Sequence, residues 1–233
     1  MRIPLENPII RELLSSNDGA KYLQQYTPEF VHGQLDFFAG LLGMIIAVTF
    51  EEKQPHLLAY HRIMVYIATQ WERLQKWHSG PCDTLALVTR NLIELNFWVN
   101  RIGDSPAAGQ EFMDQEDVEQ REIFNDYLSN HTAAQDEEES LSVRSLRILS
   151  RDWPTERRVR VERADEYERS LFKDCSKLIH ASPWVVNQPC RLHDPYMRRM
   201  YIAYCLHFLS RIATKVLSVH PDLRYLTESD EAI

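Results

Sequence analysis

Two pairs of polar residues stand four positions apart on segments that are otherwise apolar. Arg90 is followed by Glu94, and Ser176 is followed by His180 and then by a Ser-Pro-Trp sequence at 182–184. Side chains spaced i, i+4 share one helical face, so each pair can act on one ligand. Arginine offers bidentate contacts to phosphate or carboxylate, and a histidine at a helix C-terminus is favoured as its cation.

If the two segments pack side by side, the four residues form one polar pocket in which Glu94 orients Arg90 toward an anion. The structural alternative for the first pair is an internal ion pair between Arg90 and Glu94. The alternative for the second pair is a histidine, His180, that caps its own helix.

An arginine-rich stretch is the second candidate site. Residues 144–163 contain seven arginines, whereas residues 111–139 contain eleven carboxylates and one arginine. Arg157, Arg160 and Arg163 can line one side of a helix, and Trp153 offers a ring on which a base can stack. These residues predict an RNA-binding surface. The alternative is that the arginines pair with the acidic stretch.

Apolar residues recur every three or four positions along the chain, which predicts an all-α, up-and-down bundle of about six to seven helices. The cleanest register follows a 3-4-3-4-3 spacing through Leu85, Val88, Leu92, Leu95, Val99 and Ile102. We expect one helical domain over 1–233, with a bundle core at 27–219 and a polar tail at 220–233. The expected helices cover 28 to about 51, 55–78, 85–102, an acidic segment after 106, 141–150, 155–181 and 195–219, with an irregular connection at 182–189.

Composition narrows the function classes. A net charge of −8 disfavours broad nonspecific binding to nucleic acid. Four cysteines without a CxxC motif indicate a reducing compartment, so we expect a cytoplasmic protein. We expect no metal or cofactor, because Cys190, His193, Cys205 and His207 lack the spacing of a zinc knuckle. The uncharged segment Phe37–Phe50 is too short for a bilayer. It predicts a helix buried on all sides and no contact with a membrane.

The Arg-x3-Glu helix and the segment Ser176-Lys-Leu-Ile-His180-Ala-Ser-Pro resemble an uncharacterised group of bacterial all-helical proteins that are similar to HEPN domains, over residues 55–215. The resemblance implies a homodimer with a toxin or antiviral defence role and metal-independent ribonuclease activity. In that chemistry the histidine moves protons and the arginine steadies the phosphate, roles that fall here on His180 and Arg90.

The HEPN motif, Arg-x4-6-His, occurs here as Arg73 to His78, at the end of the second helix. A helix-end histidine beside a solvated arginine is the alternative for this pair. No arginine lies four to six residues before His180, a departure from the family pattern. Two other functions therefore stay open: a non-catalytic interaction scaffold that binds a protein through 111–139, and a small-ligand sensor that uses Arg90.

Overall fold

The computed structural model describes residues 23–50, 53–115, 118–119, 123, 166–180, 182–220 and 222–223. Within these ranges the chain is helical and contains no strand, which confirms the predicted all-α bundle. The elements are α3 (Pro28–Thr49), α4 (Pro55–Trp77), α5 (Cys82–Asp104), α8 (Glu166–Ile179), the one-turn helix α9 (Pro183–Val186), the 3-10 helix η3 (Pro189–His193) and α10 (Pro195–Val219).

Helix starts follow the local sequence. Thr27 accepts a hydrogen bond from the Phe30 N–H (3.3 Å), and proline occupies the first position of α3. Asp194 plays the same part before α10, where its carboxylate accepts from the N–H groups of Tyr196 (2.8 Å) and Met197 (3.3 Å). The connection predicted to be irregular at 182–189 contains the short helix α9 and leads into η3, and both elements begin with proline.

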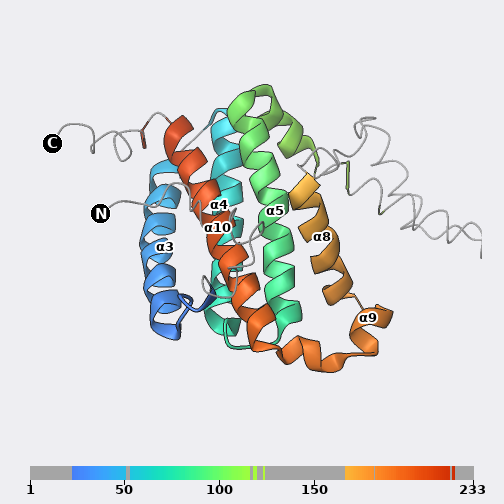
Figure 1. Ribbon diagram of the computed structural model, residues 1–233. Coiled ribbons are helices and arrows are strands. Elements are labelled where there is room, and N and C mark those ends of the chain that lie inside the picture. The colour runs from blue at the N-terminus through green and yellow to red at the C-terminus, as the bar shows by residue number, and fades with distance from the viewer. Residues whose placement is uncertain are drawn as a thin grey trace, which may run out of the picture.

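Successive long helices alternate in direction (Figure 1). Helix α3 packs on α4 at one edge, α4 packs on α5, and α10 lies between α3 and α5. Helix α8 covers the outer side of α5 and runs antiparallel to it, whereas α10 runs parallel to α5. A hydrogen bond between the Arg198 Nε and the Gly80 carbonyl (3.0 Å) ties the start of α10 to the turn before α5. The central helix α5 therefore packs against α4, α8 and α10.

The predicted core register of α5 is confirmed, because all six of its apolar residues are buried. Leu171, Cys175 and Leu178 of α8 are also buried. In α4, Leu57 is buried and Leu58 is half-buried. The predicted segments at 130–150 and the part of the sixth helix before 166 lie outside the described residues, whereas 107–115 is helical as predicted.

Helix α3 corrects one expectation. It is not buried on all sides, because Gly40, Gly43 and Ala47 are exposed on its outer side. Both α3 and α10 are long and apolar enough to cross a membrane, a property they share with core helices of water-soluble bundles. In α10, 61% of the apolar window is buried inside the bundle, against 33% in α3. Helix α3 thus keeps an apolar side that no other described element covers.

Candidate functional site

Arg90 projects from α5 against α8. Its Cζ lies 4.6 Å from the centroid of the Phe172 ring, a cation–π contact that holds the guanidinium in place. The Arg90 Nε is buried and has no hydrogen-bond partner, although the residue as a whole is half-buried. Within the described part of the chain the expected ion pair between Arg90 and Glu94 does not form, because the guanidinium turns toward Phe172 instead.

Ser176 and His180 lie further along α8. The Ser176 Oγ is half-buried and donates to the Phe172 carbonyl one turn earlier (2.9 Å). His180 is exposed just past the helix end, where its backbone N–H donates to the Ser176 carbonyl (3.1 Å). His180 follows Phe172 by eight residues, or about 12 Å along the helix axis. No hydrogen bond, ion pair or ring contact joins the Arg90 and His180 side chains among the described residues.

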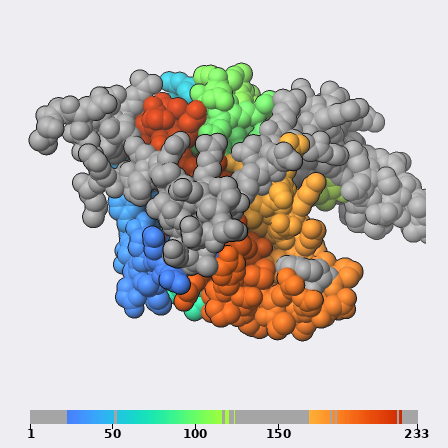
Figure 2. Space-filling model, in the orientation of Figure 1, coloured from blue at the N-terminus to red at the C-terminus, as the bar shows by residue number. Residues whose placement is uncertain are grey.

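Cationic side chains follow the exposed side of α8. Arg169, Lys173 and Lys177, here called the basic stripe, are all exposed and stand four residues apart. Neighbours in the stripe are separated by about 6 Å of helix rise, and His180 continues it three residues later. Lys177 pairs with Asp174 (3.3 Å), whereas Arg169 and Lys173 make no ion pair with any residue that the structure describes. Figure 2 shows α8 reaching the molecular surface beside α9.

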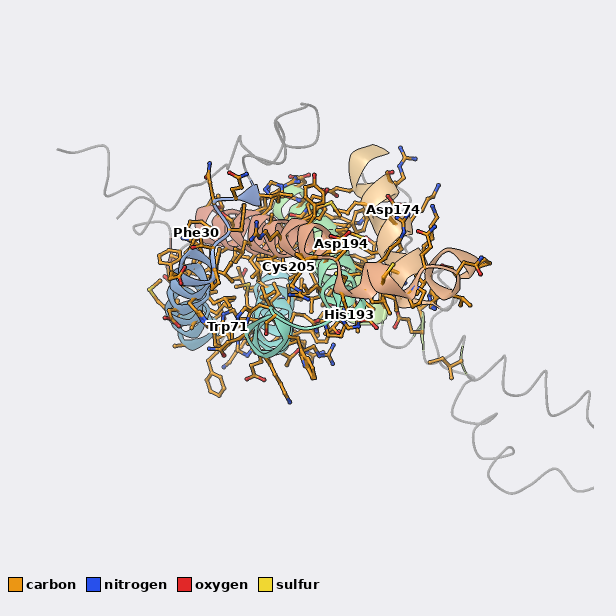
Figure 3. All side chains as sticks on the ribbon, turned by 60° about the horizontal axis from the view of Figure 1, so that its bottom comes forward. Phe30, Trp71, Asp174, His193, Asp194 and Cys205 are labelled. Atoms are coloured by element: carbon orange, nitrogen blue, oxygen red, sulfur yellow. The ribbon has the colours of Figure 1, made fainter. Side chains whose placement is uncertain are left out.

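The basic stripe and Arg90 belong to the same flank of α8. The side of α8 that faces the core carries the buried residues Glu168, Leu171, Cys175 and Leu178. Phe172 and Ser176, both half-buried, come next around the helix, and the stripe follows them. Because Arg90 lies over Phe172, its guanidinium borders the stripe. Figure 3 labels Asp174 on the outer part of α8 and the buried Cys205 in the interior of the bundle.

A second polar cluster, which the sequence analysis missed, lies at the C-terminal end of α5. It borders a pocket of about 580 Å³. The Glu168 carboxylate is buried there and accepts from the Asn96 Nδ2 (3.1 Å) and the Arg211 Nη1 (2.8 Å). Across the pocket, the Nε and Nη2 of Arg101 both donate to the Glu111 Oε2, at 2.8 and 2.6 Å. Opposite charges therefore neutralise one another around this pocket.

This cluster escaped notice because its members come from three remote helices. Asn96 lies within the apolar register of α5, and Glu168 precedes the core stripe of α8 by one turn. No spacing rule connects either residue to Arg211. Lys215 and Asp104 add a further ion pair at the same end (3.2 Å). We interpret the cluster as structural, because each of its charged groups is balanced by another side chain of the bundle.

The three buried cysteines offer no reactive thiolate, and the described cysteines form no metal site. Burial raises the pKa of Cys82 to about 11 and that of Cys205 to about 12, and it also raises the pKa of Cys175. Cys190 is exposed. No group of three or more His, Cys, Asp or Glu side chains in these ranges is arranged to hold a metal ion.

The two residues of the Arg73 to His78 motif lie on different sides of α4, and only His78 contacts α3. Arg73 is exposed, and its Nη1 is 3.5 Å from the Gln70 Oε1. The His78 Nδ1 lies 2.8 Å from the Gln75 carbonyl at the helix end, and its ring contacts His32 edge-on at 4.9 Å. These contacts match the alternative of a helix-end histidine beside a solvated arginine.

The RNA-binding residues predicted at Trp153, Arg157, Arg160 and Arg163 lie outside the described residues, as does most of the acidic stretch 111–139. The chain gives no match to a protein-family model, to a curated protein or to a solved structure. The resemblance to HEPN domains therefore stays a prediction. Among the described residues, the candidate functional site is the flank of α8 that carries the basic stripe and adjoins Arg90.

Proposed function

We propose that the protein binds single-stranded RNA, with the basic stripe of α8 contacting successive phosphates. The observation that carries the proposal is that two cations, Arg169 and Lys173, lie exposed and without an acidic partner in the described structure, beside the guanidinium of Arg90. Cationic side chains in a row supply the sequence-independent part of nucleic-acid affinity by displacing counterions from phosphates.

For such binding, the charge close to the bound phosphate matters more than the net charge of −8 of the chain. Salt screens charges beyond about 8 Å at physiological ionic strength, so a bound phosphate senses the stripe rather than the whole chain. Residues 144–163, which precede α8 in the sequence, contain seven arginines. This further positive charge supports a polyanion over a single small anion as the ligand.

The proposal is for binding rather than cleavage. General acid–base cleavage needs an imidazole and a guanidinium within reach of the same phosphodiester. His180 stands about 12 Å along α8 from the turn that contacts Arg90. This separation supports two contacts on different phosphates. Incubation of labelled RNA with the wild type should therefore leave the RNA intact, and cleavage that is lost in His180→Ala would restore the ribonuclease hypothesis.

The binding test is fluorescence anisotropy with a labelled single strand of about 20 nucleotides at several salt concentrations. We expect the triple variant Arg169→Gln/Lys173→Gln/Lys177→Gln to bind at least tenfold more weakly than the wild type. The slope of log affinity against log salt should fall by about 2, since each lost phosphate contact removes about 0.7 for a single strand.

A matched control removes three exposed cations from α4, in Arg62→Gln/Arg73→Gln/Lys76→Gln. Its net charge equals that of the α8 variant, so it reports the effect of total charge alone. The control should retain most of the affinity. An equal loss in both triple variants, or no binding by the wild type at low salt, would reject α8 as the RNA-binding element.

A further inference from the structure

Helix α3 carries two regular stripes on opposite sides. The inner stripe packs into the bundle through Val31, Leu35, Phe38, Leu42, Ile45 and Thr49, all buried. The second, here called the outer seam, follows a 4-3-4-3-4-3 spacing, and its members are all exposed: Glu29, Gly33, Asp36, Gly40, Gly43, Ala47 and Phe50, which directly follows α3. Such spacing is that of a helix that packs lengthwise against another helix. No helix among the described residues covers the outer seam, and α3 lies at one edge of the described bundle (Figure 1).

The composition of the outer seam is unfavourable for a helix side that faces solvent. A solvent-facing helix side normally carries charged residues, yet α3 has none from Phe37 to its end. Glycine is the poorest helix former after proline. Around Gly33, Gly40 and Gly43, an added Cβ would meet nothing within 4 Å. No contact inside the bundle therefore requires these glycines, whereas close approach of a second helix would.

We infer that the outer seam of α3 binds the same seam of a second copy of this chain, with the two helices antiparallel. The seam is complementary to itself when Gly40 of one copy faces Gly43 of the other. The same register sets Asp36 against Ala47, and Gly33 against Phe50. Phe50 is 71% exposed, and it would fill the space left open beside Gly33. Each bulky residue then meets a small one.

The charges of α3 decide between the two orientations. A parallel pair would place Asp36 directly against Asp36 of the other copy, and Glu29 against Glu29. In the antiparallel pair the two Asp36 residues are eleven positions apart, about 16 Å along the axis, where salt screens their repulsion. Glu29 of one copy then faces the C-terminal end of α3 in the other copy, away from both carboxylates of that helix.

The size of the seam indicates a weak, concentration-dependent dimer. Helix α3 has 22 residues and is about 33 Å long. At a helix–helix contact width of about 10 Å, it buries roughly 300–400 Å² per copy, below the ~800 Å² of a standard interface. Val65 of α4 is 43% exposed on the flank that carries His61, which contacts Phe50, and it can extend the contact.

Sedimentation equilibrium of the full chain across micromolar concentrations tests the inference. The wild type should dimerise, and Gly43→Lys should weaken the dimer at least tenfold, because the lysine stem blocks close approach. At concentrations where both proteins are monomeric, the same variant should melt at a higher temperature than the wild type, since its Cβ enters open space and lysine is a better helix former. Ser79→Lys, an exposed turn position with the same added charge, should dimerise normally.

The orientation is tested with a short bifunctional thiol cross-linker in a Cys190→Ser background, in which the other native cysteines are buried. The antiparallel register predicts cross-linking of the double variant Asp36→Cys/Ala47→Cys and of neither single variant. Cross-linking of Asp36→Cys alone would show a parallel pair and overturn the inference.

Two further outcomes would reject the second copy as the occupant. One is a wild type that stays monomeric at every concentration, or a dimer that Gly43→Lys leaves intact. The other is a monomeric wild type that sediments with phosphatidylcholine vesicles and loses this ability in Gly43→Lys, since the seam would then be a membrane contact. Neither outcome depends on RNA binding by α8, so the two proposals fail separately.

Discussion

At the scale of single residues, the buried charge of Glu168 is the most demanding feature of the bundle. A buried carboxylate destabilises a fold unless donors surround it. Here Asn96 and Arg211 supply two donors from two different helices, and the Glu168 side chain is only 6% exposed. The neighbouring Arg90 differs, because its buried Nε has no partner and its charge rests on the Phe172 ring. The first arrangement secures the fold, and the second leaves donors for a ligand.

We predict that Arg211→Leu lowers the free energy of unfolding by about 2–3 kcal/mol, because it leaves the Glu168 carboxylate buried without its cation. The comparison is Lys177→Ala, which breaks an ion pair whose two side chains are 61% and 58% exposed. That change should cost less than about 0.5 kcal/mol. Urea denaturation monitored by circular dichroism measures both. Equal losses would contradict a structural role for the buried pair.

At the scale of elements, the start of each helix sets which residues reach α8 and α5. Asp194 begins α10 with two side-chain hydrogen bonds, and the Cys82 thiol at the start of α5 lies 3.6 Å from the Asp194 carbonyl. This junction fixes the parallel alignment of α10 with α5. It thereby positions Arg211, four turns further along α10, opposite Glu168 of α8.

Asp194→Ala should lower the free energy of unfolding by about 1–2 kcal/mol, because two N–H groups of the first turn of α10 lose their acceptor. Gln54 is the matched control, since it precedes the first turn of α4 and makes no capping hydrogen bond through its side chain. Gln54→Ala should be nearly neutral. Thermal melts of the two variants beside the wild type decide whether the cap at Asp194 contributes as described.

At the scale of the whole molecule, the packing of α10 against the bundle buries His207. This burial makes the free energy of unfolding depend on pH. Burial, reinforced by the cation of Arg211, lowers the pKa of His207 from 6.5 to about 4. Between these two values the unfolded chain binds a proton that the folded chain does not. The contribution of neutral His207 to the free energy of unfolding is therefore fully present above about pH 6.5, and it is lost progressively as the pH falls toward 4.

We predict that the urea midpoint of the wild type falls between pH 7.5 and pH 5, and that it falls less in His207→Gln, which cannot bind the proton. The measurement is made at both pH values for each protein, and the quantity compared is the change in midpoint rather than its absolute value. A pH dependence that is the same in both proteins would show that His207 does not titrate between the folded and unfolded states as its burial requires.

Much of the fold could be predicted from local patterns. The register of α5 from Leu85 to Ile102, the prolines that begin α3, α4 and α10, and the breaks near Gly80 and Pro106 depend on residues within one or two turns of one another. Backbone geometry and apolar periodicity act over that range, so the all-α bundle and the approximate ends of its long helices could be predicted from the sequence. The exposed side of α3 was not, because an uncharged segment has the same composition whether one side or all sides are covered.

The candidate site divides in the same way. The sequence by itself determined which side chains share a helical face, such as Ser176 with the turn of Phe172, and the four-residue spacing of the basic stripe. Only the tertiary structure decided that Arg90 leaves Glu94 for the ring of Phe172, that His180 stays apart, and that Glu168 meets Asn96 and Arg211. Contacts between remote helices depend on how whole faces pack, and spacing along one helix carries no information about the face that it will meet.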